Sequence, residues 1–131
     1  MKGRVTYIVL TILTLTACND NKTGTKSNMT TVETTKQTMT SGYSEVNGIK
    51  MYYEIYGQGK PLVLIHGGGS TIQTTFGRVI PLFSNDRQLI CVELQAHGRT
   101  GDRNTPISFE QDSEDVAALL KNLNINKADI F

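Results

Sequence analysis

One stretch of the sequence constrains the fold more than any other. Residues 62–65 form the continuous apolar run Leu-Val-Leu-Ile, and His-Gly-Gly-Gly-Ser follows at residues 66–70. An unbroken apolar run of this length is typical of a strand covered on both faces. Three successive glycines leave backbone N–H groups free of side chains, so that they can bind a phosphate or an oxyanion. The stretch therefore predicts a buried strand that ends in an anion-binding loop.

The segments around this strand predict a hairpin followed by alternating helices and strands. Two β-rich runs, 43–46 and 49–56, flank an Asn-Gly pair, which is a strong hairpin signal. Apolar residues at helical spacing predict a helix over 72–83 that Pro81 limits or kinks. A second buried strand is expected at 88–93. The expected fold class is α/β, with an antiparallel hairpin leading into a mostly parallel sheet with flanking helices.

The last quarter of the chain predicts one more helix and the start of a strand. Ser108 and Gln111 fit a capping box at the start of that helix. We expect its buried face to hold five apolar residues: Phe109, Val116, Leu119, Leu120 and Leu123. We expect its acidic residues to lie on the solvated face: Asp112, Glu114 and Asp115. Residues 128–131 begin a further strand, and we interpret the chain as truncated there, before a complete sheet has formed.

The start of the chain has the features of an export signal. Lys2 and Arg4 precede an apolar run over 5–15 that is too short to span a bilayer. The run ends in Leu-Thr-Ala-Cys, which resembles a bacterial lipobox with Cys18 as the acylated residue. Residues 1–17 are therefore expected to be a lipoprotein signal peptide. A membrane anchor through Cys18 would place the chain in the cell envelope, at the outer membrane or periplasmic face if there are two membranes.

Composition changes again after the lipobox. Residues 18–41 are rich in threonine and nearly free of apolar side chains, so they are expected to form a disordered tether. Residues 42–131 are expected to form a partial globular domain. With 13 Lys and Arg against 12 Asp and Glu, the net charge of +1 argues against nucleic acid as a partner.

The cysteines and histidines do not predict a metal site. The chain has two of each, Cys18, Cys91, His66 and His97, and their spacing fits no usual closed zinc site. Cys91 lies within an apolar run and is expected to be a core thiol. No metal and no cofactor are expected.

Three segments together resemble the first part of an α/β-hydrolase: "VNGIKMYYEIYG", "PLVLIHGGGS" and "VELQAHGRTGD". The resemblance covers residues 42–131. It implies that Gly68 donates an oxyanion-hole N–H, that Gly67 and Gly69 shape the loop, and that His66 and His97 are structural. The third segment matches the family pattern D-x-R-G-H-G-R-S only in part: Glu93 replaces Asp, and Gln95 and Ala96 replace Arg-Gly. These departures weaken the assignment to a subfamily more than the assignment of the fold.

The resemblance also shows which catalytic parts this sequence lacks. The family nucleophile stands on G-x-S-x-G after the strand that Ala128 begins here, so it is expected after Phe131. None of the serines Ser70, Ser84, Ser108 and Ser113 has that context. The resemblance implies that the full-length protein is a serine hydrolase of a small-molecule substrate. This chain alone is then expected to be inactive.

Two other classes of function stay open. A dinucleotide-binding unit would also place a glycine-rich turn between strand and helix, with Glu93 as the acidic residue, but Ile72 stands where its third glycine belongs. A non-catalytic binding module would explain the missing triad. It would have to protect the sheet edge at Phe131, for example by pairing in a homodimer. The oligomeric state is left open.

Overall fold

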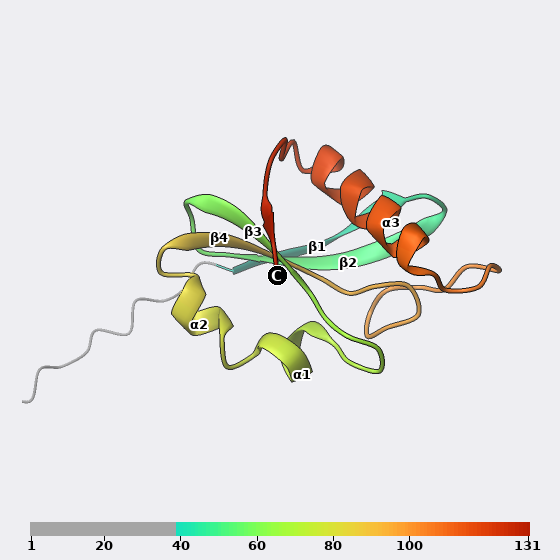
Figure 1. Cartoon of the computed structure of the whole chain (residues 1–131), viewed down its shortest axis with the longest axis horizontal. Coiled ribbons are helices and arrows are strands. Elements are labelled where there is room, and N and C mark those ends of the chain that lie inside the picture. The colour runs from blue at the N-terminus through green and yellow to red at the C-terminus, as the bar shows by residue number, and fades with distance from the viewer. Residues whose placement is uncertain (1–38) are drawn as a thin grey trace, which may run out of the picture. The chain divides into compact units, whose positions relative to one another are not determined.

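The computed structural model describes residues 39–131, and the predictions for the signal peptide, Cys18 and most of the tether lie outside this range. A five-stranded mixed sheet forms the centre of the described part (Figure 1), with the strand order β1-β2-β4-β3-β5. The strands are β1 (Met39–Val46), β2 (Ile49–Tyr56), β3 (Lys60–Ile65), β4 (Arg87–Val92) and β5 (Asp129–Ile130). The first strand includes residues 39–41, the last three residues of the expected tether.

The predicted hairpin is confirmed. Val46 pairs with Ile49 across the turn, and the turn residues Asn47 and Gly48 both have positive φ, 43° and 88°. Asn-Gly suits this turn because both positions need left-handed backbone. Strand β2 then pairs antiparallel with β4, whereas β3 pairs parallel with both β4 and β5. The antiparallel part of the sheet is therefore larger than the hairpin alone.

Successive side chains of the central strands point to opposite faces of the sheet, so the core has two layers. On one face, Val63 and Ile90 pack against α3 (Phe109–Asn122). On the other, Leu64 and Cys91 pack against α1 (Ile72–Phe76) and α2 (Ile80–Phe83). Both β3 and β4 are thus covered on two faces, as the continuous apolar runs predicted. Figure 1 shows the single long helix and the two short helices on opposite sides of the sheet.

The expected helix over 72–83 is two short helices instead of one. Thr71 caps α1 and forms a reciprocal capping box with Thr74, which the sequence analysis did not find. Pro81 lies in the first turn of α2, where its missing N–H costs no helical hydrogen bond. Pro81 therefore favours a new helix start at this point. None of the helices in residues 39–131 is long and apolar enough to cross a bilayer.

Helix α3 differs from its sequence prediction at its N-terminal end. Ser108 caps it by accepting from the Gln111 N–H, but the Gln111 side chain donates to Asp115 instead of returning to the cap. Val116 and Leu119 are buried and Leu120 and Leu123 are partly buried, as expected, but the Phe109 side chain is 91% exposed. Phe109 is therefore not a core residue, and it lines an open cavity with Ile65 and Leu94.

The prediction of a solvated acidic face on α3 is wrong for Asp115. Its side chain is fully buried and forms an ion pair with Arg103. It also accepts hydrogen bonds from Asn47 Nδ2 and Gln111 Nε2, each at 2.9 Å. Asp115 thus connects the hairpin turn, the loop after β4 and the helix. Glu114, one residue earlier, is exposed as expected.

Candidate active site

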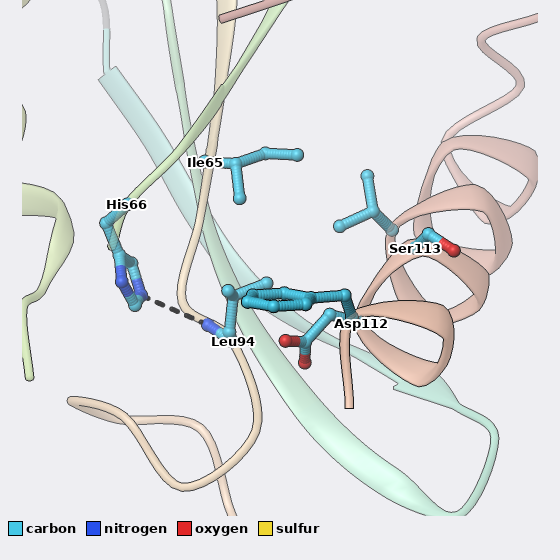
Figure 2. A pocket seen from close by; sticks show the side chains of 7 residues that line it. Ile65, His66, Leu94, Asp112 and Ser113 are labelled. Carbon is cyan, nitrogen blue, oxygen red and sulfur yellow. Dashed lines mark hydrogen bonds between the residues drawn. The ribbon is translucent and has the colours of Figure 1, made fainter. Parts of the chain in front are cut away.

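The glycine-rich loop begins where β3 ends, and His66 anchors it. The imidazole is 3% exposed. Its Nε2 accepts the Leu94 N–H at 3.2 Å, and its Nδ1 is hydrogen-bonded to Gly67 O at 2.8 Å. Figure 2 shows His66 directed at the Leu94 backbone. The ring therefore joins the carboxyl end of β3 to the segment that follows β4.

A second histidine holds the other end of the loop. Gly69 donates its N–H to His97 Nε2 at 3.1 Å, and His97 Nδ1 is hydrogen-bonded to Gln95 O at 2.8 Å. The two imidazole centroids are 5.0 Å apart. The structure thus brings together His66 and His97, which are 31 positions apart in the sequence.

The middle of the loop is open. Gly67 and Gly68 are exposed, and an added Cβ at either position would meet nothing within 4 Å. Within residues 39–131, neither of their amides donates to a protein acceptor, whereas the Gly69 amide does. Backbone N–H groups without a protein acceptor, such as these two, can stabilise negative charge on a bound oxygen.

An ionic cluster with two buried carboxylates and a partly exposed arginine fixes the loop after β4. Arg99 pairs with Glu93 at 2.6 Å and with Glu54 at 2.9 Å, and its guanidinium lies 3.7 Å from the centroid of the Tyr52 ring. Burial of Glu93 raises the pKa of its carboxyl, but the hydrogen bonds from Arg99 outweigh this and hold the pKa below its ordinary value. The cluster determines the path of the segment that carries His97.

Glycine is required inside this cluster at position 98. Gly98 has φ +55°, and an added Cβ would lie 2.3 Å from Glu93 Oε2. Gly101, three residues later, has open space around it. The Glu93 side chain, which stands where the family has Asp, therefore fills the space that a side chain at position 98 would need.

Sequence reasoning missed the role of Glu54. Its carboxylate is 2% exposed and accepts from Tyr52 Oη at 3.0 Å, Tyr56 Oη at 2.6 Å and Gln73 Nε2 at 3.1 Å, besides Arg99. Tyr52, Glu54 and Tyr56 alternate along β2 and so share one face. A charged residue between two inward-facing tyrosines was the available signal.

A cavity of about 240 Å³ lies between the ends of β3 and β4 and the first turns of α3 (Figure 2). It is lined by Ile65, His66, Leu94, Phe109, Asp112, Ser113 and Val116. One carboxylate oxygen of Asp112, Oδ1, is buried and has no hydrogen-bond partner within residues 39–131. Burial, followed by the neighbouring Asp115 carboxylate, raises the pKa of Asp112.

Replacing Asp112 by asparagine is expected to stabilise the chain at pH 7 by about 0.5 kcal/mol, because the amide removes a poorly solvated charge. Loss of a favourable charge near the helix N-terminus limits the gain. The folded-state pKa is raised, so the native state takes up a proton at higher pH than the unfolded state. The wild type should therefore approach the D112N variant in stability as pH falls toward 3.8.

Urea unfolding at pH 7 and pH 3.5 measures this difference, with the exposed Glu114→Gln as the matched control. A D112N variant that is less stable than the wild type at pH 7 would show that the Asp112 charge is satisfied.

No nucleophile is present in the described site. Ser84 and Ser113 donate their hydroxyls to the carbonyls of Ile80 and Glu110. No serine in residues 39–131 is hydrogen-bonded to an imidazole, and that range holds no group of three metal-ligating side chains. Burial raises the pKa of the Cys91 thiol to about 12, so it stays protonated at neutral pH and is a core side chain, as predicted.

The chain is similar in sequence to three characterised proteins. It is 30% identical over 95 residues to proline iminopeptidase of Clostridioides difficile (strain 630), covering 68% of this chain and 32% of that protein. It is 35% identical over 88 residues to the dihydrolipoyllysine-residue acetyltransferase component of the acetoin cleaving system of Pseudomonas putida (65% and 23%). It is 28% identical over 74 residues to pyrrolizixenacetamide deacetylase of Xenorhabdus hominickii (56% and 28%). The chain thus spans a third or less of each relative. No family model matches it.

Solved structures give the fold. The Cif epoxide hydrolase from Acinetobacter nosocomialis is 30% identical with a TM-score of 0.59, over 65% of this chain and 27% of that one. The epoxide hydrolase CorEH is 27% identical with a TM-score of 0.67 (71% and 32%). An α/β-hydrolase-fold protein from Burkholderia ambifaria is 21% identical with a TM-score of 0.63 (68% and 33%). The described residues therefore form part of an α/β-hydrolase fold, and these similarities indicate the α/β-hydrolase family.

Proposed function

We propose that the chain supplies the oxyanion-binding part of a serine-type α/β-hydrolase that acts on an ester, an amide or a related carbonyl compound. The observation that carries this proposal is the open loop after β3, in which the Gly68 amide has no acceptor within residues 39–131 while His66 and Gly69 are held in place. Two of the relatives are named as an iminopeptidase and a deacetylase, which supports an amide or a similar carbonyl bond as the target.

The proposed reaction has two stages. A serine hydroxyl attacks the substrate carbonyl carbon while its proton passes to a base, and the carbonyl oxygen becomes an oxyanion held by the Gly68 N–H and a second N–H. The carbonyl re-forms as the leaving group departs with a proton, which leaves an acyl-enzyme. Water then attacks the acyl carbon and releases the acid. The serine, acid and catalytic histidine are proposed to follow Phe131 in a longer protein, so the 131-residue chain alone is inactive.

Lipid anchoring is a separate proposal. Charge, apolar run and lipobox occur in the required order before Cys18, which supports acylation of that cysteine and a position in the cell envelope. Mass spectrometry of the chain from a bacterial membrane fraction tests this proposal. An acylated N-terminal Cys18 is expected in the wild type and no lipid in Cys18→Ser.

Epoxide hydrolysis is the second candidate, favoured by the 30% identity to the Cif enzyme. Such a reaction opens a strained ring and needs no acyl transfer. The two candidates therefore separate by substrate: a p-nitrophenyl ester for the first and a styrene-oxide-type epoxide for the second.

The deciding experiment is to sequence the coding DNA beyond the codon for Phe131 and to assay both substrate classes. G-x-S-x-G within about ten codons, with ester or amide turnover by the longer product, is the expected result. In that product Gly68→Pro removes the N–H and should lower kcat about 10²–10³-fold. A stop codon directly after Phe131 or ester turnover by the 131-residue chain itself would contradict the proposal.

A further inference from the structure

We infer that His97 is a positioning residue that determines which amide of the glycine-rich loop is free to bind an oxyanion. It does so by accepting the Gly69 N–H, so that the Gly69 amide is occupied while the Gly67 and Gly68 amides stay free of acceptors within residues 39–131. The functional part of this inference rests on the proposed oxyanion role of Gly68. The tautomers and hydrogen bonds of His66 and His97 do not depend on that role.

The hydrogen bonds around His97 determine where its ring carries a proton. The Gly69 backbone N–H can only donate, so His97 Nε2 must be unprotonated to accept it at 3.1 Å. A carbonyl oxygen can only accept, so His97 Nδ1 must carry the proton that it donates to Gln95 O at 2.8 Å. His97 is therefore a neutral imidazole with its proton on Nδ1.

The same reasoning applies to His66. Its Nε2 accepts the Leu94 N–H, and its Nδ1 donates to Gly67 O. Both ends of the loop, at Gly67 and Gly69, are thus tied to imidazoles in one tautomeric state, and the two rings are 5.0 Å apart. A proton added to Nε2 of either ring would remove an acceptor and place a donor against a backbone N–H.

The charged groups nearby act on both rings. Asp112 of α3 is the acidic residue within electrostatic range of His66, His97 and Arg103 of the loop after β4. On the β4 side, Glu93 and Arg99 already neutralise each other. The tautomer of each ring is therefore assigned from its hydrogen bonds and not from these charges.

Nuclear magnetic resonance on the full 131-residue chain, labelled with ¹⁵N, tests the inference. Two-bond ¹H–¹⁵N correlations at pH 7.5 should show the Nδ1–H tautomer for both histidines, and a coupling across the hydrogen bond should connect Gly69 N to His97 Nε2. The Nε2–H tautomer at His97 would overturn the inference. This measurement on the unaltered chain decides the matter even if a variant does not fold.

Variants then test the consequence. In His97→Ala, amide exchange at Gly69 should rise roughly five- to tenfold relative to Gly68, as expected for one lost hydrogen bond. His97→Gln, whose side-chain oxygen can accept the N–H, should restore most of the protection, and the exposed Asn104→Ala in the same loop should change nothing.

Equal Gly69 exchange in His97→Ala and the unaltered chain would also overturn the inference. None of these measurements depends on hydrolysis. A failure of the proposed function would therefore appear in the assays of the longer product, whereas a failure of this inference would appear in the tautomer and exchange data.

Discussion

Replacing Asp115 by alanine is expected to lower the free energy of unfolding by about 3–5 kcal/mol. The side chain of Arg103, its ion-pair partner, is only 10% exposed, so the substitution leaves a buried guanidinium without a counter-charge. It also leaves Asn47 Nδ2 and Gln111 Nε2 without their acceptor. Chemical denaturation monitored by circular dichroism measures the change.

Glu114→Ala is the matched control because it removes a carboxylate from the adjacent, exposed position of the same helix. Its effect should stay within about 0.5 kcal/mol. If D115A is too unstable to fold, the double variant Asp115→Asn with Arg103→Met, which removes both charges, should recover folding. A D115A variant as stable as E114A would disprove a structural role for the ion pair.

Replacing Arg99 by alanine should cost about 2–4 kcal/mol. The side chains of Glu54 and Glu93 are 3% and 1% exposed, and without Arg99 they would be two neighbouring buried anions. The cost falls below that of a fully buried pair because the Arg99 side chain is 40% exposed and water screens it. Urea unfolding at pH 7 measures the loss, and the exposed Arg78→Ala is the control.

The ionic cluster of Arg99, Glu93 and Glu54 also predicts that the free energy of unfolding depends on pH. The folded-state pKa of Glu93 is below its ordinary value, so the unfolded state binds the proton more readily. Its stabilisation is complete above an ordinary carboxyl pKa, about 4.3, and is lost as pH falls through the lower folded-state pKa. In R99A this dependence should reverse, because the Glu93 carboxylate would keep its burial, which raises its pKa, and lose the Arg99 side-chain hydrogen bonds that lower it. If R99A and the wild type lost stability in the same way as pH falls, Arg99 would not be the cause of the lowered Glu93 pKa.

Local sequence signals were sufficient to predict a feature wherever that feature depends on a single turn or strand. Asn47 and Gly48 specify their own turn, and the apolar run over 62–65 needs cover on both faces whatever provides it. The glycine-rich loop after this run was found for the same reason. The positions of Gly67, Gly68 and Gly69 in the resemblance pointed to the open loop that the structure shows, while the catalytic role of Gly68 stays a prediction.

The burial and the hydrogen-bond partners of a side chain could not be predicted where they depend on residues far away in the sequence. Phe109 has the spacing of a core residue, but its side chain lines an open cavity and is 91% exposed, so the burial that this spacing predicts is absent. Asp115 resembles any acidic residue near a helix start, and only the approach of Arg103 and Asn47 explains its burial. Gln111 fits a capping box, yet Asp115 offers it a buried carboxylate four residues away.

The sequence by itself determined the strands, the long helix and the position of the glycine-rich loop, because apolar periodicity and turn chemistry act between neighbours in the chain. Only the tertiary structure decided how that loop is held. His97 contacts the loop directly, and Glu54 holds Arg99 in the segment that carries His97. Asp115 joins α3 to Arg103 and to the hairpin turn. Buried charges and imidazoles take their roles from the groups they meet in space, and those groups lie as far as 68 residues away, as Asn47 does from Asp115.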